Sequence, residues 1–274
     1  MSSSIRVLAP ILTLVLCFGL TACGHRNVAT SRPAPGQPGG QTQSFAVTPP
    51  RFGDSHPVDW KGTRPAHYPV HGVDISGWQG AVDWQTARAH GVNFAYLKAT
   101  EGGDRVDPAF SSNWQSTAAA GVPRGAYHFF YHCRSAIQQA RWFISHVPHT
   151  PDALPPVLDV EWTPQSPTCP GKRPAETVRS EAQVFLRAVQ NAYGKRPILY
   201  TTLDFYQENE LWRMSGVNSW LRSVKAHPSD SFPGQHWILW QYSGTGKVPG
   251  IGGPADLDAF AGSAEEFSAW LDQG

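Results

Sequence analysis

The chain has no marked excess of charge of either sign. Its 22 Lys and Arg residues are nearly matched by 21 Asp and Glu residues, which leaves a formal net charge of +1. The sequence also lacks a run of basic residues, a glycine-rich phosphate loop and a heptad repeat. Because the usual signatures of nucleic-acid binding are missing, nucleic acid is not expected as a partner.

The first 22 residues are predicted to be a lipoprotein signal peptide. A short basic start precedes an apolar stretch from Val7 to Leu20, which has signal-peptide length and is too short for a spanning helix. Residues 20–23 (LTAC) resemble a bacterial lipobox, in which Cys23 is lipidated; an ordinary secretory signal with an incidental cysteine is the alternative. Both interpretations predict export, and the lipobox predicts a membrane-anchored lipoprotein facing the cell wall or periplasm.

Residues 23–67 are predicted to be a flexible linker that begins at the lipidated cysteine. They are rich in Pro, Gly, Ser, Gln and Thr, a composition that cannot bury enough apolar surface to offset the entropy of ordering. Apolar clusters return after Tyr68, so residues 68–274 are expected to form one globular domain.

Cysteine is scarce, with four residues in the chain. Cys17 lies in the predicted signal peptide and Cys23 in the lipobox, which leaves Cys133 and Cys169. An isolated pair in an oxidising compartment indicates one disulfide, whereas the absence of a Cys-x-x-Cys or His spacing disfavours metal binding. A disulfide closing a loop of this length stabilises by on the order of 3–4 kcal/mol.

The domain alternates between strand-like and helix-like segments. Five strand–helix units are expected, followed by three strands joined by loops and a terminal helix. The predicted strands are 71–76, 93–100, 124–130, 156–161, 197–202, 219–224, 236–242 and 256–260, and the predicted helices are 82–90, 111–120, 135–147, 176–193, 204–214 and 264–271. The fold class is therefore α/β, an irregular TIM-like barrel, with a flat doubly wound sheet as the alternative.

Acidic residues fall at the ends of several predicted strands. Asp159 and Glu161 end the fourth strand and, being two residues apart, point to the same face. Asp74, Glu101 and Asp256 lie at the first, second and eighth strands. In an α/β barrel such positions meet at one rim, where a protonated and an ionised carboxyl group suit acid–base cleavage of a glycosidic bond. A surface-exposed acidic strand end is the alternative.

An ordered series of motifs resembles the glycoside hydrolases of family 25, the Chalaropsis-type lysozymes. The resemblance spans roughly residues 70–271 and rests on GVDISGWQG (72–80), YLKATEG (96–102), GAYHFF (125–130), PVLDVE (156–161), PILYT (197–201), LWQY (239–242) and ADLDAF (255–260). It implies a β-1,4-N-acetylmuramidase that cleaves between N-acetylmuramic acid and N-acetylglucosamine in peptidoglycan, without cofactor or metal. A monomer is expected, with peptidoglycan glycan strands and, through Cys23, the membrane as its partners.

The resemblance also assigns catalytic residues. It implies that Glu161 is the acid/base and that Asp159, Asp74 and Asp256 are its acidic companions. Asp159 either orients the 2-acetamido group for attack on C1, the favoured interpretation, or acts as a nucleophile. Asp258 is expected to turn outward.

Further side chains are candidates for substrate contacts, with core packing or a structural role as the alternative and, for Glu101, an exposed loop acid. These are Tyr127, Tyr200, Gln79, Trp162, Trp240 and Glu101. Two rival functions are a catalytically weakened peptidoglycan-binding lipoprotein and another hydrolase on a similar barrel. No G-x-S-x-G motif supports the second.

Overall fold

The structure, a computed structural model, describes residues 45–273. The predicted signal peptide, the lipidation site at Cys23 and the predicted linker up to residue 44 lie outside the described residues. None of the described helices is long and apolar enough to cross a membrane.

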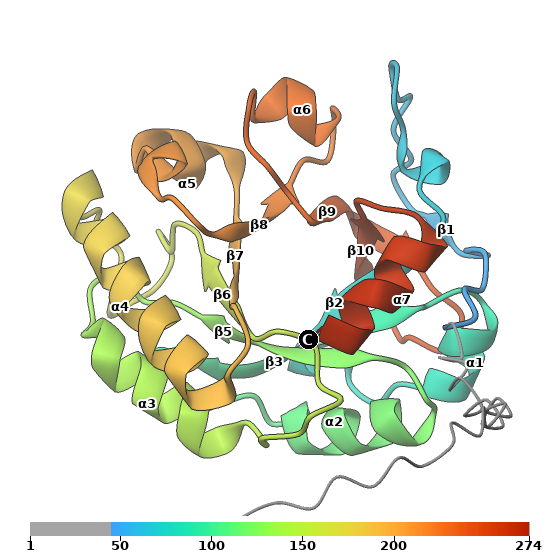
Figure 1. The fold of residues 1–274 in the computed structure, drawn as a ribbon, viewed down its shortest axis with the longest axis horizontal. Coiled ribbons are helices and arrows are strands. Elements are labelled where there is room, and N and C mark those ends of the chain that lie inside the picture. Colours follow the sequence, from blue (N-terminus) through green and yellow to red (C-terminus); the bar gives the residue numbers. More distant parts are fainter. Residues whose placement is uncertain (1–44, 274) are drawn as a thin grey trace, which may run out of the picture. The chain divides into compact units, whose positions relative to one another are not determined.

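A closed sheet forms the centre of the described residues (Figure 1). Its strands follow the order β1-β9-β10-β2-β3-β5-β6-β7-β8, where β1 is Gly53–Asp54, and β8 also pairs with β9, which closes the barrel. The barrel strands are β2 (His71–Ile75), β3 (Phe94–Glu101), β5 (Arg124–Phe129), β6 (Val157–Val160), β7 (Ile198–Thr201), β8 (Asn218–Arg222), β9 (Leu239–Lys247) and β10 (Ala255–Phe260). The predicted irregular barrel is confirmed, and the flat sheet is excluded.

Strand direction explains why the acids share one rim. The seven strands β2, β3, β5, β6, β7, β8 and β9 each run parallel to the next one in this series. Strand β10 completes the barrel and is antiparallel to both of its neighbours, β9 and β2. Residues at the start of β10 therefore lie beside residues at the end of β2, and Asp256 pairs with Asp74. One acid from the start of a strand thus joins acids from the ends of parallel strands.

Helices surround the barrel, and the C-terminal one packs against its interior apolar cluster (Figure 1). The longer ones are α2 (Phe110–Ala119), α3 (Ala136–His146), α4 (Ala175–Tyr193) and α7 (Ala264–Gln273), and the shorter ones are α1 (Trp84–Ala89), α5 (Leu203–Glu208) and α6 (Pro228–Ser231). Three short 3-10 segments are η1 (Pro65–His67), η2 (Gly77–Gln79) and η3 (Leu211–Arg213). Gly194 ends α4 with a left-handed backbone, φ 71°, a conformation that glycine adopts without strain.

Alternation along the strands divides the core into two parts. Residues such as Tyr96, Val157 and Trp220 fill the barrel interior, while their chain neighbours pack against the helices in a second apolar cluster. Gly125 leaves room for this filling, since a Cβ atom there would lie 2.2 Å from the Tyr96 ring. Further along the same inner face, towards the rim, the apolar side chains give way to polar ones.

The globular unit begins before residue 68, the predicted boundary. Residues 45–67, expected to belong to the flexible linker, pack on the barrel. Strand β1 (Gly53–Asp54) pairs with β9, and Trp60 packs edge-on against Trp240. Thr48 exchanges two hydrogen bonds with the Asn93 side chain. Three aromatic residues, Phe45, Phe52 and Trp60, give this polar segment enough apolar surface to be ordered against the barrel.

The predicted disulfide is present. Cys133 and Cys169 lie in the loops after β5 and β6, with their Cα atoms 5.7 Å apart. His132 and the carbonyl of Gly171 also join these loops. The link fixes the two loops that follow neighbouring barrel strands.

Candidate active site

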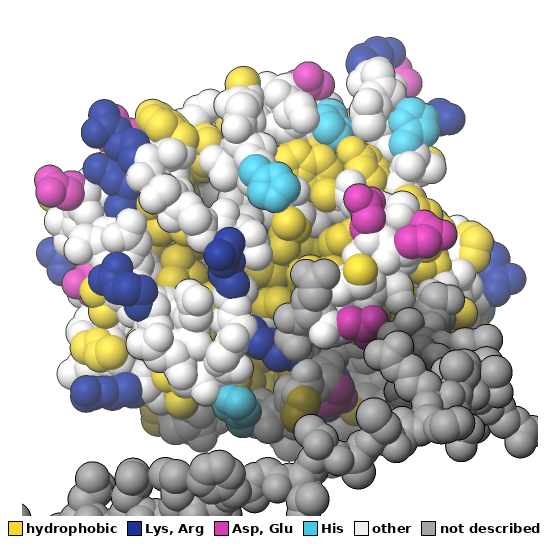
Figure 2. Space-filling view, in the orientation of Figure 1, with side chains coloured by type: hydrophobic (Ala, Val, Ile, Leu, Met, Phe, Trp, Pro, Cys, Tyr) yellow, Lys and Arg dark blue, Asp and Glu magenta, His cyan; other side chains and the backbone are white. Residues whose placement is uncertain are grey.

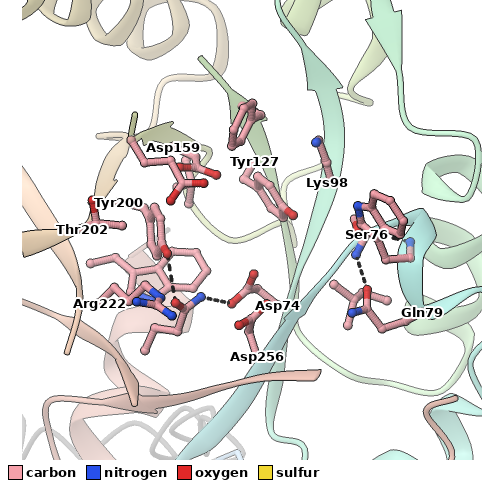
Figure 3. Close-up of a pocket in the computed structure, with 17 residues that line it drawn as sticks. Asp74, Ser76, Gln79, Lys98, Tyr127, Asp159, Tyr200, Thr202, Arg222 and Asp256 are labelled. Carbon is pink, nitrogen blue, oxygen red and sulfur yellow. Dashed lines mark hydrogen bonds between the residues drawn. The ribbon is translucent and has the colours of Figure 1, made fainter. Parts of the chain in front are cut away.

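A cavity of about 420 Å³ opens where the ends of the parallel strands meet. Four of the predicted acids line it: Asp74, Asp159, Glu161 and Asp256. Figure 3 shows Asp74, Asp256 and Asp159 around one space together with Tyr127 and Tyr200. Residues separated by up to 182 positions in the chain are thus brought together by the closure of the barrel.

The alternation of side chains along β6 directs Asp159 and Glu161 into the cavity. Val157, Asp159 and Glu161 all line the cavity, while Leu158 and Val160 are buried among the outer apolar residues. Asp159 lies deeper, with 7% of its surface exposed, and its Oδ1 has no hydrogen-bond partner among the described residues. Burial and the neighbouring Glu161 raise the pKa of Asp159 well above its usual range.

Glu161 is the more accessible of the two. Burial raises the pKa of its carboxyl, and the negative charges of Asp204 and Asp256 act in the same direction, whereas Arg222 and Lys98 oppose the rise. The result favours the neutral form over a wider pH range than for a free glutamate. A carboxyl group that keeps its proton near a cavity wall is suited to protonating a leaving oxygen.

Asp74 ends a chain of hydrogen bonds across the barrel (Figure 3). The Tyr200 hydroxyl donates to Gln241 Oε1 at 2.9 Å, and Gln241 Nε2 donates to Asp74 Oδ2 at 2.7 Å. Tyr200 and Gln241 are almost completely buried, so these bonds fix the side chains firmly. These two hydrogen bonds fix the orientation of the Asp74 carboxyl group and of the Gln241 side-chain amide.

Asp256 faces the one arginine among the cavity-lining residues. Burial raises the pKa of Asp256 to about 6, and the guanidinium of Arg222 opposes this rise. Arg222 is the last residue of β8 and follows the interior residue Trp220 by two positions, which places it on the inner face. Arg222 was not among the predicted site residues, although its position two residues after Trp220 indicates an inward side chain.

Glu101 is near the cavity but does not line it. Its carboxylate binds Lys98 at 2.7 Å, accepts from the Tyr131 hydroxyl and lies 3.7 Å from Arg105. Lys98 itself lines the cavity and lies over the Phe129 ring. Glu101 therefore holds a cavity-lining cation in place, and Lys98 is a site residue that the sequence analysis missed.

Tyr127 and Gln79 both line the cavity. Gln79, however, uses both ends of its side-chain amide within the protein. Its Oε1 accepts from Ser76 N at 2.9 Å, and its Nε2 donates to the Pro254 carbonyl at 2.9 Å. These bonds hold the loop after β2 near the start of β10. Next to it, Trp78 lines the cavity while 92% exposed, a residue that the sequence analysis did not propose.

Trp162 and Trp240 do not line the cavity. Each directly follows or precedes a cavity residue, Glu161 or Gln241, so alternation turns it to the opposite face. Trp162 packs against Phe205 and His132. Trp240 is fully buried and donates from Nε1 to the Ser223 carbonyl at 2.7 Å. Both positions correspond to the core-packing alternative.

The expectation for Asp258 was wrong. Asp258 is fully buried inside the barrel and accepts a hydrogen bond from Trp220 Nε1 at 2.9 Å. It follows Asp256 by two positions, and residues two apart on a strand share a face. Asp256 and Asp258 therefore both point inward.

Charged groups outside the cavity are of both signs. Figure 2 shows Lys, Arg, Asp and Glu side chains scattered around hydrophobic surface on one face of the protein. This distribution agrees with the net charge of +1. The concentration of carboxyl groups in the cavity is thus a local feature of the site.

Comparison with known proteins gives a consistent picture. The family model described as glycosyl hydrolases family 25 matches residues 73–251. The uncharacterized protein YegX of Escherichia coli K12 is 39% identical over 213 residues, covering 76% of this chain and 75% of that protein. Lysozyme M1 of Streptomyces globisporus is 34% identical over 211 residues, covering 73% of this chain and 70% of that enzyme.

Solved structures show the same fold. A family 25 glycosyl hydrolase from Bacillus anthracis is similar with a TM-score of 0.69 and 34% identity, covering 78% of this chain and 99% of that one. A bacterial lysozyme from Streptomyces coelicolor is similar with a TM-score of 0.66 and 32% identity, covering 74% and 97%. With its barrel, its acidic rim and these matches in agreement, the chain belongs to the glycosyl hydrolases of family 25.

Proposed function

We propose that this protein is a lysozyme that hydrolyses the β-1,4 bond between N-acetylmuramic acid and N-acetylglucosamine in peptidoglycan. The observation that carries the proposal is the pair Asp159 and Glu161 at the end of β6, which opens into a cavity lined by two further acids. The names of related lysozymes support the same substrate. A cavity of about 420 Å³ has room for sugar units on both sides of one bond.

Glu161 acts as the general acid and then as the general base. Its raised pKa keeps a proton available for the leaving oxygen, and once ionised the same carboxylate removes a proton from the attacking water. Arg222 and Lys98 limit how far the pKa rises, so the group is able to return to the ionised state.

Asp159 assists at the anomeric carbon. Its carboxyl group lines the cavity and accepts a hydrogen bond from the acetamido N–H of the substrate, which directs the acetamido oxygen at C1. The alternative is direct attack by Asp159, with a glycosyl ester as intermediate. Trapping with a fluorinated substrate separates the two, since an ester isolated on Asp159 would contradict acetamido assistance.

The remaining cavity residues bind and orient the sugar. Asp74 and Asp256 provide negative charge that stabilises a developing oxocarbenium ion. Tyr127 and Tyr200 present hydroxyl groups near the reacting centre, although the Tyr200 proton is already donated to Gln241. The exposed ring of Trp78 offers a flat apolar surface for the C–H face of a sugar.

Product analysis tests which bond is cleaved. Digestion of purified peptidoglycan is followed by mass spectrometry of the soluble muropeptides after borohydride reduction. The proposal requires reduced N-acetylmuramic acid at the new ends. Reduced N-acetylglucosamine at those ends would assign the enzyme to the other glycosidic bond, and intact glycan strands would argue against glycosidase activity.

We further propose that the protein is exported and attached to a membrane through a lipid on Cys23, which supports action on the cell wall close to that membrane. The support is the lipobox-like sequence at residues 20–23. Wild-type protein is then expected in the membrane fraction, and the Cys23→Ser variant in the soluble exported fraction. Equal distribution of the two proteins would argue against lipidation.

A further inference from the structure

Asp258 is a fully buried acid beside the proposed active site. It lies on the inner face of β10, two residues after Asp256, with no exposed surface. Its Oδ1 accepts a hydrogen bond from Trp220 Nε1 at 2.9 Å. Asp258 also interacts electrostatically with Asp74, which lines the cavity on the neighbouring strand β2.

The two oxygens of Asp258 differ in their surroundings. Oδ1 has the indole N–H as a donor, whereas Oδ2 is buried and has no N–H or O–H donor among the described residues. An ionised Asp258 would therefore leave a charged oxygen unsatisfied in the barrel interior, which is costly. A proton on Oδ2 removes this cost, because the group can then donate to the neighbouring carboxylate.

The Asp74 carboxylate is the acceptor available to a proton on Asp258 Oδ2. It is 8% exposed, faces the cavity and already accepts from Gln241 Nε2 at 2.7 Å. Asp258 has one donor and no access to the cavity. Two adjacent buried carboxyl groups cannot both ionise at low cost, so a single charge settles on the better solvated member.

We propose that Asp258 is a neutral positioning residue whose Oδ2–H donates to Asp74, so that the pair carries one negative charge, on the carboxylate that faces the substrate. The inference rests on the proposed function, since Asp74 is one of the acids assigned to the site. Together with Gln241, Asp258 fixes both the orientation and the ionisation of Asp74.

The other groups around the pair are consistent with this charge state. The ionisable residues facing Asp258 are Asp74 from β2, Tyr96 from β3, Asp256 from its own strand and Tyr242 from β9. Burial raises the pKa of both Asp258 and Asp74, and the negative charge of Asp74 raises that of Asp258 further. No positively charged side chain among these neighbours compensates a charge on Asp258.

Two nearly isosteric substitutions test the proposal. Asp258→Asn keeps an acceptor for Trp220 and an N–H donor for Asp74, whereas Asp258→Leu keeps neither. We expect the Asn variant to retain at least about a third of the wild-type kcat/KM on soluble glycan. The Leu variant should lose roughly tenfold or more in kcat, with the acidic limb of its pH profile moved to higher pH, because Asp74 has lost a donor.

The outcomes are distinguishable from simple misfolding. Both variants are first compared with wild type by thermal unfolding and circular dichroism. A folded Asn variant with less than about a tenth of the activity would overturn the proposal, since it would show that the charge of Asp258 is needed. A Leu variant with an unchanged pH profile would also overturn it.

Infrared difference spectroscopy detects whether the Asp258 carboxyl group is protonated and does not depend on enzyme activity. At neutral pH, wild type minus Asp258→Asn should show the C=O stretch of a protonated carboxyl group, and its absence would contradict the proposal. If wild type failed to cleave peptidoglycan but showed this band, the proposed function would fail while the charge assignment stood.

Discussion

At the scale of single residues, position along a strand decides the role of each side chain. Asp159 and Glu161 share the inner face of β6, and their neighbour Trp162 is turned away from the cavity. The same alternation separates Gln241, which holds Asp74, from the buried Trp240. Burial then raises the pKa of the inward carboxyl groups, which prepares one of them to hold a proton.

Trp78 provides a test of substrate contacts at this scale. If its exposed ring stacks on a sugar, Trp78→Ala should raise KM for polymeric glycan roughly five- to tenfold, about 1 kcal/mol, with little change in kcat. Steady-state kinetics on soluble glycan strands measures this. Trp212→Ala is the control, because Trp212 is 51% exposed and does not line the cavity. Equal KM values for Trp78→Ala and wild type would argue against stacking.

At the scale of elements, the sequence predicts the strands and helices of the barrel better than it predicts which strand side chains point into its interior. Five strand–helix units and three further strands are recognisable from their periodicity, and their order in the chain is the one observed. Asp258 lies on the inner face with Asp256, contrary to the prediction, because residues two apart on a strand point to the same side. The same two-residue period turns Trp162 and Trp240, both predicted candidates for sugar contacts, away from the cavity.

The start of the domain was harder to predict for a physical reason. Residues 45–67 contain many prolines and few periodic apolar positions, so they show no helix or strand pattern of useful length. Their order comes from long-range contacts, such as those of Trp60 with Trp240 and of Phe45 with Phe267. Such contacts depend on where the barrel places its surface, which local sequence patterns do not report.

Truncation tests the contribution of this segment. A chain beginning at residue 68 should unfold about 10 °C below one beginning at residue 45, because it exposes Trp240 and leaves the edge of β9 unpaired. Differential scanning calorimetry of the two chains measures the difference. Identical unfolding temperatures would mean that residues 45–67 add nothing to the stability of the barrel.

At the scale of the whole molecule, the barrel assembles a cluster of acids that opposes its own stability. Asp256 has a pKa raised from 3.8 to about 6, so the folded state holds its proton more tightly than the unfolded state does. The protonated Asp256 therefore contributes to the free energy of unfolding. This contribution is complete below the unfolded pKa and is lost as the pH rises through about 6. The site is thus maintained at the expense of folding free energy at neutral pH.

Asp256→Asn measures this cost. The Asn side chain does not titrate. The free energy of unfolding of the variant, relative to that of wild type, should therefore be higher at pH 7.5 than at pH 4 by on the order of 2 kcal/mol. Urea unfolding at the two pH values gives the difference in free energy of unfolding. If the difference between variant and wild type stayed constant with pH, Asp256 would not be the destabilising group proposed here.

The most direct test of the account concerns Glu161. Clearing of a suspension of purified peptidoglycan is followed for wild type and Glu161→Gln, and binding of both proteins to the sedimented wall is measured in parallel. The account predicts that wild type clears the suspension and that the variant binds equally well but is slower by about 10²- to 10⁴-fold. Equal clearing by the two proteins would contradict the assignment of Glu161. Binding without clearing by wild type would show a wall-binding protein in place of an enzyme.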